Sequence, residues 1–208
     1  MMKLYYAPGA CSQAVHITLH EAAIEHNSER VDLRAKRTAS GADYWTINPK
    51  GAVPALDLGD GQVLTENAAI LQLIGDLAAD VGLFPPVGDL QRYRVLEWLN
   101  FIATELHKGF GPLWNPASSE DAKQGARDLL AKKFDFAERQ LGDKPFVMGD
   151  RFTLPDSYLF VMLSWGGVHG IDMSRWPALS LYHRRIGERP SVRLVLRAEG
   201  LVEAETAS

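Results

Sequence analysis

The stretch GAVPALDLGDGQVLTENAAI, residues 51–70, holds the features that decide the fold. Residues 54–58 and 62–64 are short apolar runs joined by the turn sequence Gly-Asp-Gly, which is a strong β-hairpin signal. The polar residues 65–67 then stand at the start of a helical pattern that covers 66–79, where they suit capping of the helix. The stretch therefore predicts a hairpin that leads straight into a helix.

Further elements are predicted on the N-terminal side of this stretch. Residues 3–6 and 30–33 have the composition of strands, and residues 12–24 between them carry a helical pattern. The order is β-α-β, then a variable piece, then β-β-α. This order predicts an α/β domain over residues 1–80 that is built on a small mixed sheet and is not a Rossmann unit.

The rest of the chain differs from residues 1–80 in its sequence patterns. Residues 81–89 contain two prolines and two glycines with little periodicity, so they are predicted to form a linker. Residues 90–208 carry almost no strand signal and are predicted to form an all-α domain. The helical patterns of this domain cover residues 90–113, 120–141, 155–168, 177–188 and 191–197.

Composition narrows the class of protein. The chain has 208 residues, 46% of them hydrophobic, which is enough for a core without disulfides. A single cysteine fits a reducing cytoplasm. A net charge of −4 with only short basic runs argues against nucleic acid. The longest apolar stretch, Tyr158 to Val168, is far shorter than the about 20 residues of a spanning helix, so we expect no membrane partner.

Cys11 is the only cysteine, and it falls at the first turn of the helix predicted over 12–24. Unpaired backbone N–H groups and the helix dipole at that place favour a thiolate. A buried structural cysteine is the alternative, and position alone does not separate the two. Residue 14 is alanine, so a two-cysteine redox motif is excluded. What remains is a lone thiol suited to holding, or forming a mixed disulfide with, a small external thiol.

Two other places suit a peptide ligand. A cis bond between Val53 and Pro54 would turn the Val53 backbone toward a groove where an extended peptide can pair. Only about one X–Pro bond in twenty is cis, and a plain strand-initiating proline is the alternative. Glu66 at a helix start, among exposed N–H groups, suits the zwitterionic end of an amino acid, with ordinary capping as the alternative.

Two further patterns are interpreted as structural. His16 and His20 have a spacing that suits a metal ion, but no third ligand is evident nearby. We therefore predict an exposed helix face and no metal site. Thr153 and Asp156 form a capping pattern that starts a buried helix. No glycine-rich phosphate loop or Ser-His-Asp signature is present.

Taken together, these motifs resemble those of the glutathione transferases. The order is a strand, a catalytic residue at a helix start, Val-Pro before a strand, and Glu with a polar residue at the next helix start. NFIATELHKGFGPLWNP at 100–116 is similar to the bacterial beta class, which uses cysteine where other classes use tyrosine or serine. DRFTLPDSYLF at 150–160 resembles the buried helix start of the superfamily. The resemblance runs to about residue 202 and implies a thioredoxin-like domain followed by a helical one.

The resemblance also implies a glutathione site. Cys11 would contact the glutathione sulfur, and Val53, on the bend made by Pro54, would pair with the cysteinyl part of the tripeptide. Glu66 and Asn67 would hold the γ-glutamyl end. The glycyl carboxylate would be reached by Lys36.

The helical domain or a partner subunit would supply the rest of the site. His107 would stabilise the glutathione thiolate or act as acid–base partner, and these roles stay open. Its expected neighbours toward glutathione are Asn100, Thr104 and Glu105. The electrophile would dock against the apolar side chains of Phe110, Leu113, Trp114 and Trp165.

The resemblance thus implies a cytoplasmic homodimeric enzyme that conjugates glutathione to small hydrophobic electrophiles. Glutathione is the co-substrate, and no metal is expected. Cys11 would give a secondary thiol-transfer activity. Two alternatives are a glutathione-dependent disulfide reductase or peroxidase, and a protein that binds glutathione or hydrophobic ligands without turnover.

Overall fold

The computed structural model describes residues 1–203, which form two compact units. Unit 1 comprises Met1–Gly82 and the described part of the segment that begins at Glu188, and unit 2 comprises Leu83–Gly187. Among residues 1–203, no helix has the length and apolar character needed to cross a membrane.

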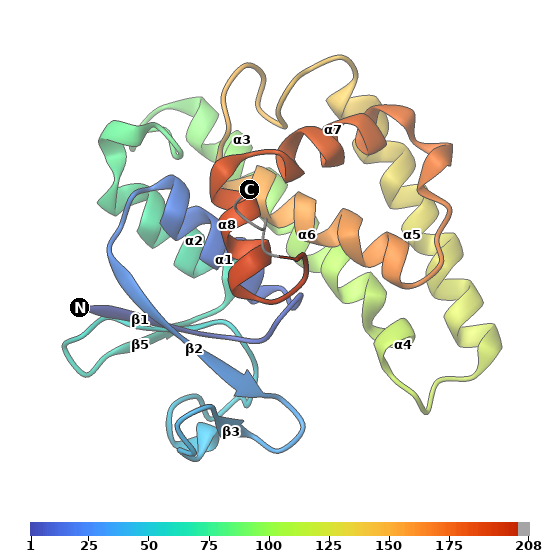
Figure 1. Cartoon of the computed structure of the whole chain (residues 1–208). Helices are drawn as coiled ribbons and strands as arrows, with labels where there is room; N and C mark the ends of the chain where they lie inside the picture. Colours follow the sequence, from blue (N-terminus) through green and yellow to red (C-terminus); the bar gives the residue numbers. More distant parts are fainter. Residues whose placement is uncertain (204–208) are drawn as a thin grey trace. The chain divides into compact units, whose positions relative to one another are not determined.

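Unit 1 is built on a five-stranded mixed sheet with the order β3-β2-β1-β4-β5 (Figure 1). β1 and β2 are parallel, whereas the other neighbouring pairs are antiparallel. The predicted β-α-β and β-β-α order is confirmed. The strands are β1 (Met2–Tyr6), β2 (His26–Asp32), β3 (Arg37–Thr38), β4 (Ala55–Asp57) and β5 (Val63–Thr65). β3 was not predicted, because two polar residues carry no periodicity.

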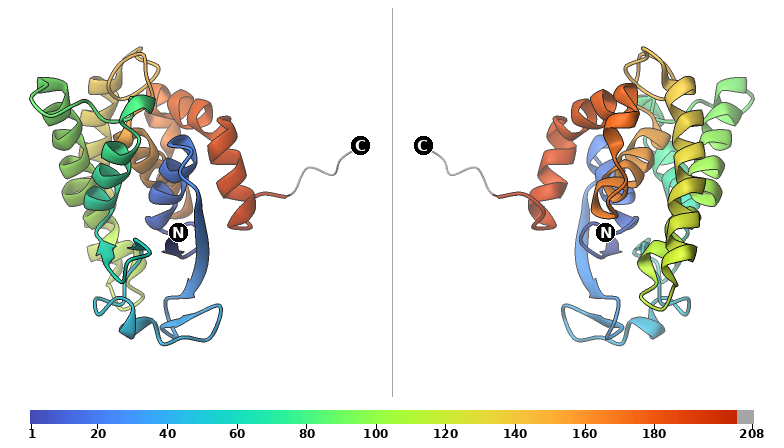
Figure 2. Two further views of the ribbon diagram at one scale, coloured as in Figure 1. Left: turned by 90° about the vertical axis from the view of Figure 1, so that its left-hand side faces the viewer. Right: turned by 90° about the vertical axis from the view of Figure 1, so that its right-hand side faces the viewer.

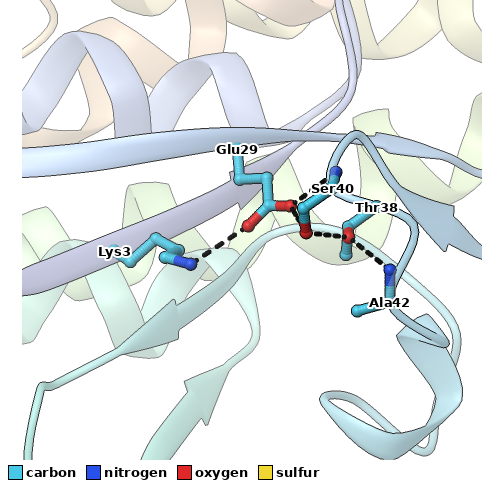
Figure 3. A network of polar contacts seen from close by, with 5 residues as sticks. All are labelled: Lys3, Glu29, Thr38, Ser40 and Ala42. Atoms are coloured by element: carbon cyan, nitrogen blue, oxygen red, sulfur yellow. Dashed lines mark hydrogen bonds and ion pairs between the residues drawn. The ribbon is translucent and has the colours of Figure 1, made fainter.

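A polar network fixes the turn after β3 to the sheet (Figure 3). The carboxylate of Glu29 on β2 accepts from Lys3 Nζ at 3.0 Å and from the Ser40 hydroxyl at 2.6 Å. Thr38 Oγ1 bonds the same hydroxyl and accepts from the Ala42 N–H at 3.1 Å. Burial opposes ionisation of Glu29, but the hydrogen bonds from Ser40 and Lys3 prevail and lower its pKa to about 2.

The helices of unit 1 come from both ends of the chain. α1 (Ser12–Glu21) packs against β1, α2 (Asn67–Leu77) and α8 (Pro190–Ala198), and is buried from Ser12 to Leu19. Arg189, just before α8, makes two 2.7 Å contacts with the Glu21 carboxylate at the end of α1. The segment from Glu188 therefore belongs with the N-terminal domain, whereas the sequence interpretation assigned all of 90–208 to the helical one.

Unit 2 is all-helical. α6 is buried along nearly its whole length, and Figure 2 shows α3 and α5 beside one another in both views. Trp98 and Phe101 on α3 contact Phe136 on α5, with ring centroids 6.1 and 4.9 Å apart. The helices are α3 (Leu90–Phe101), α4 (Gly111–Trp114), α5 (Glu120–Leu141), α6 (Leu154–Val168) and α7 (Pro177–Gly187), with a 3-10 turn at Met173–Arg175.

The helix predicted over 90–113 is broken in the structure. A π-helical segment, η3, covers Ile102–His107, and a 3-10 turn, η4, covers Lys108–Phe110 before α4 begins. Gly109 lies where a Cβ atom would stand 2.9 Å from the Leu130 side chain, so the chain passes close to α5 there. π segments inside helices recur at functional sites, and this one ends at His107.

The predicted linker is more ordered than its composition suggested. Leu83 and Phe84 are buried in unit 2, and the Arg92 guanidinium lies 3.7 Å from the Phe84 ring centroid. The Leu83 carbonyl accepts from the Leu154 N–H at 3.3 Å. Residues 83 and 84 are thus part of the core of the helical unit.

The predicted capping role of Asp156 is confirmed, and its contacts extend further. Asp156 Oδ2 accepts from the N–H and hydroxyl of Thr153 at 2.8 and 2.9 Å. Asp156 Oδ1 accepts from the Val147 N–H at 2.8 Å and the Tyr182 hydroxyl at 2.9 Å. Burial raises the pKa of Asp156 to about 6, although these four donors oppose the rise. One carboxylate therefore joins the start of α6 to α7 and to the loop before it.

Candidate active site

Cys11 stands at the N-cap of α1 with 8% of its surface exposed. Its thiol donates to the Val53 carbonyl at 3.2 Å. Among the residues that the structure describes, its side chain makes no capping bond with the helix backbone. The sequence placed the cysteine correctly, but the sulfur points toward the Val53 segment, and not at the helix amides as we had expected.

The Val53 segment has the features that a peptide ligand needs. The Val53–Pro54 bond is cis, which the sequence had left open. Val53 is 7% exposed, and no hydrogen bond within residues 1–203 engages its N–H. This backbone donor, beside the Cys11 thiol, is suited to pairing with an extended peptide.

The bend before Val53 is held by side chains that the sequence analysis missed. Tyr44, fully buried, donates its hydroxyl to the Ala52 carbonyl at 2.9 Å, and Asn48 Nδ2 donates to the same oxygen at 2.7 Å. Burial raises the pKa of Tyr44 to about 12, so it stays a donor. Gly51 has a φ of 60°, and a Cβ atom there would stand 2.6 Å from the Trp45 ring. Both facts require glycine at this turn.

Lys36, which the resemblance assigned to the glycyl carboxylate, lies at the same bend. Its Nζ donates to the Gly51 carbonyl and stands 5.4 Å from the Trp45 ring centroid. Lys36 also has a φ of 54°. The ammonium group is therefore held two residues before Val53, where an anionic end of a bound peptide would find a positive partner.

Glu66 and Asn67 begin α2, and both are constrained. Glu66 is exposed, has a φ of 75° and pairs with Lys50, a residue with no local signal in the sequence. A non-glycine residue at such a φ is strained, and strain of this kind clusters at functional sites. Asn67 is 5% exposed, and its Nδ2 donates to the Cys11 carbonyl at 2.8 Å. Its Oδ1 is buried and has no partner among the described residues.

The C-terminal segment reaches the loop that carries Cys11. Glu199 is 5% exposed and accepts from the Gly9 N–H at 2.9 Å, from Gln13 Nε2 at 2.9 Å and from His16 Nδ1 at 3.1 Å. No sequence pattern joins residues so far apart in the chain. This contact fixes both sides of Cys11 to the segment after α8.

The histidine pair on α1 is not an exposed face, so that prediction was wrong for His16. His16 is 2% exposed and contacts the rings of His20 and His26, with centroids 5.4 and 5.8 Å away. Burial, followed by the charges of His26 and His16, lowers the pKa of His20 to about 4. His26, at the start of β2, is the third imidazole that the sequence had not revealed, because the turn after α1 brings it back.

His107 lies in unit 2, at the end of the π segment. Its Nδ1 is 2.6 Å from the hydroxyl of Tyr158 on α6, and its ring centroid is 5.1 Å from that of Trp165. Tyr158 is buried, so the histidine is held by a fixed partner. The sequence analysis named His107 as a site residue but did not identify Tyr158 as its partner.

The other three polar candidates in unit 2 use their side chains locally. Thr104 Oγ1 donates to the Asn100 carbonyl at 2.9 Å, and Asn100 Nδ2 donates to the Leu96 carbonyl at 2.8 Å. Glu105 forms an ion pair with Lys133 on α5 at 2.6 Å. Asn100 and Thr104 are exposed, so both side chains remain accessible.

The four apolar candidates divide into two groups. Phe110 is fully buried and Trp165 is 6% exposed, with their ring centroids 5.5 Å apart. Trp114 is 50% exposed and stacks edge-on against Trp165 at 5.1 Å, while Leu113 is half-buried. Phe110 thus belongs to the core of unit 2, contrary to expectation, because it packs among Phe134, Trp165 and His169.

Comparison with known proteins shows similarity to glutathione S-transferases over both units. The family model "Glutathione S-transferase, N-terminal domain" matches residues 9–77, and "Glutathione S-transferase, C-terminal domain" matches residues 101–190. "Glutathione S-transferase GstA" of Escherichia coli O157:H7 is 46% identical over 200 residues, covering 96% of this chain and all of that one.

Two solved structures have the same fold. The "Bacterial beta class Sphingomonas chungbukensis Glutathione S-transferase" has a TM-score of 0.93 at 46% identity, covering 96% of this chain and all of that one. A sphingomonad glutathione S-transferase "complexed with glutathione" has a TM-score of 0.92 at 44% identity, with the same coverage. The chain therefore belongs to the glutathione S-transferase family, and within it to the bacterial beta class.

Proposed function

We propose that unit 1 binds glutathione with its sulfur against Cys11, and that the enzyme transfers this sulfur to small hydrophobic electrophiles. As a member of its family, the chain is a transferase with glutathione as co-substrate. One observation carries the proposed site. Cys11 contacts Val53 through its thiol and Asn67 through its carbonyl, at 3.2 and 2.8 Å. Three segments far apart in sequence thus meet at Cys11.

The backbone at Val53 supports the orientation of the tripeptide. The free N–H of Val53 would pair with the cysteinyl part of glutathione, which brings the ligand sulfur to Cys11. Lys36 at the bend would attract the glycyl carboxylate. Glu66 would hold the γ-glutamyl ammonium, and Lys50, now paired with Glu66, would turn to the neighbouring carboxylate.

The chemistry follows from the thiol of glutathione. Most of it is protonated at neutral pH, so a group that stabilises the thiolate raises the fraction that attacks. Cys11 would donate its S–H to that thiolate, exchanging the Val53 carbonyl for a charged acceptor. The thiolate then bonds to the electrophilic carbon, and the leaving group departs with the electron pair of the broken bond.

Side chains of unit 2 would bind the electrophile. Trp114 and Leu113 are accessible apolar side chains, with Trp165 packed behind Trp114. His107, fixed by Tyr158, is the acid–base candidate of this unit. Asn100, Thr104 and Glu105 would lie toward glutathione. Following the family pattern, we also propose a homodimer in the cytoplasm.

An assay with a chromogenic aryl halide tests the conjugation. Wild-type protein should form the thioether at a rate well above background and saturate with glutathione. Trp114→Ala should raise KM for the aryl halide and leave KM for glutathione unchanged. Leu181→Ala on α7 serves as the control, because it also removes an exposed apolar side chain. A rate equal to background, with glutathione bound, would favour the storage alternative and overturn the proposal.

A secondary thiol transfer is supported by the lone, contacted thiol of Cys11. Cys11 would attack a glutathione mixed disulfide, take the glutathionyl group and release the other thiol. Reduced glutathione would then attack the Cys11 adduct, which frees the Cys11 thiol and releases glutathione disulfide. Cys11→Ser should abolish this exchange and leave measurable conjugation. Retention of exchange in Cys11→Ser would exclude this role.

A further inference from the structure

We propose that His16, His20 and His26 form a binding site for a divalent transition metal ion, with Zn²⁺ as the ion that fits best. The proposal concerns unit 1 alone and is independent of the transferase reaction. His16 and His20 are one helical turn apart on α1, and His26 is the first residue of β2. A turn of four residues, 22–25, joins the two elements.

The three imidazoles converge. One ring nitrogen of each lies within 4.8 Å of a ring nitrogen of the other two. A tetrahedral zinc ion with bonds of 2.0–2.1 Å holds its ligand nitrogens about 3.3 Å apart. The rings must therefore close by about 1.5 Å at most. His20 and His26 are only half-buried, so small side-chain rotations bring them in.

Hydrogen bonds already orient two of the rings as metal ligands. A carboxylate oxygen and a backbone carbonyl only accept, so His16 Nδ1 donates to Glu199 at 3.1 Å and His26 Nδ1 donates to Ile24 at 2.8 Å. Both contacts leave Nε2 of the neutral ring with its lone pair free for a cation. A ligand histidine whose second nitrogen is bound to a carboxylate or carbonyl is the usual arrangement around zinc.

The donor set selects the class of ion. Three imidazoles with no carboxylate facing the ion suit Zn²⁺, Ni²⁺ or Cu²⁺ and do not suit Ca²⁺ or Mg²⁺, which prefer oxygen. Three protein ligands leave the fourth position of a tetrahedral zinc ion to water. The half-exposed His20 and His26 give an entry path, while His16 and the Tyr6 ring, 5.2 Å away, close the inner side.

The site would cross-link parts of unit 1. His16 is bound to Glu199, which also accepts from the Gly9 N–H two residues before Cys11. A bound ion would thus join α1, β2 and the C-terminal segment. Because it binds only the folded arrangement, it would raise the midpoint of thermal unfolding, and the rise would grow with the logarithm of the free zinc concentration once that exceeds Kd.

Calorimetric titration of untagged full-length protein with zinc chloride tests the site. We expect one ion per chain and a higher midpoint of thermal unfolding with zinc than with chelator. Glu199→Gln should weaken binding by about 10- to 100-fold, since it loses the carboxylate behind His16. His20→Phe keeps an aromatic ring in place but removes the ligand, so it should weaken binding at least as much. His183→Gln in unit 2 is the matched control and should bind normally.

Two further measurements keep the result decisive if a variant folds poorly. Cys11→Ser should bind zinc like wild type, which separates the histidine cluster from the thiol. Anomalous diffraction at the zinc edge from the wild-type crystal should place one peak among the three rings. Wild-type binding by a folded His20→Phe, or a peak elsewhere or absent, would overturn the proposal and leave the cluster as ring packing only.

Discussion

At the scale of single residues, the proposed site depends on how Cys11 is held. Its thiol, its carbonyl and the loop before it each have a partner from a different segment: Val53, Asn67 and Glu199. Such long-range contacts give precise placement, because each partner is itself buried. A change in any of them is expected to move the sulfur as well as reduce stability.

Asn67 provides the first prediction. Asn67→Ala removes the hydrogen bond to the Cys11 carbonyl and also an unpartnered buried oxygen, so the net loss of unfolding free energy should be about 1 kcal/mol. Asn67→Asp should be less stable than Asn67→Ala at pH 7, because a carboxylate cannot donate and would face the Cys11 carbonyl. Chemical denaturation of the three proteins measures this order, and a stable Asp variant would contradict it.

At the scale of elements, two carboxylates join helices and strands that sequence patterns reveal one at a time. Asp156 binds the start of α6 to Tyr182 on α7, and Glu29 binds β1 and β2 to the turn after β3 (Figure 3). Asp156 is fully buried and Glu29 is half-buried, and each has several donors. Their loss therefore leaves donors unpaired in more than one element.

Asp156→Ala should lower the free energy of unfolding by about 3 kcal/mol or more. It leaves the N–H groups of Val147 and Thr153 buried without an acceptor, and each such group costs about 1–3 kcal/mol. Asp156→Asn is the matched control, since its one remaining oxygen keeps part of the network. Urea denaturation followed by circular dichroism measures both, and equal stability of the Ala variant and wild type would refute the role.

Glu29 gives a pH-dependent prediction. Its pKa is lowered from 4.5 to about 2 in the folded chain, so its contribution is complete above pH 4.5 and is lost as the pH falls toward 2. Wild type should exceed Glu29→Gln by about 1–2 kcal/mol at pH 7 and by less at pH 3. Denaturation at the two pH values measures the difference, and a constant difference would show that the charge does not matter.

At the scale of the whole molecule, the chain returns after Gly187 to the unit where it began. The segment from Glu188 packs α8 on α1 and places Glu199 against the Gly9 loop. The transferase would then depend, through unit 1, on residues nearly two hundred positions from Cys11. This connection makes the segment from Glu188 part of unit 1, where we propose that glutathione binds.

A double-mutant cycle at Arg189 and Glu21 tests this connection. The two-contact pair is partly buried, so the coupling energy from Arg189→Ala, Glu21→Ala and the double variant should be about 1–3 kcal/mol. An exposed pair on one helix, Arg94 and Glu97, is the control and should couple by about 0.5 kcal/mol or less. Equal coupling energies would contradict the proposed connection.

Periodicity and turn signals were enough to predict nearly every helix and four of the five strands, because these depend on local pattern. These local signals did not predict the features that depend on tertiary contacts. The π segment before His107, the burial of Phe110 and the third histidine near His16 depend on neighbours distant in sequence. The Cys11 site was predicted through motif order, whereas its partners Lys50 and Glu199 left no local signal.

Intact mass after treatment with oxidised glutathione tests whether Cys11 faces the sulfur of bound glutathione. We expect one glutathionyl group on Cys11, removed by reductant, and formed faster than the adduct from bis(2-hydroxyethyl) disulfide, which lacks the peptide. Lys36→Ala should reduce that preference, while Arg34→Ala, an exposed cation nearby in sequence, should keep it. An unmodified Cys11, or equal rates with the two disulfides, would contradict the account.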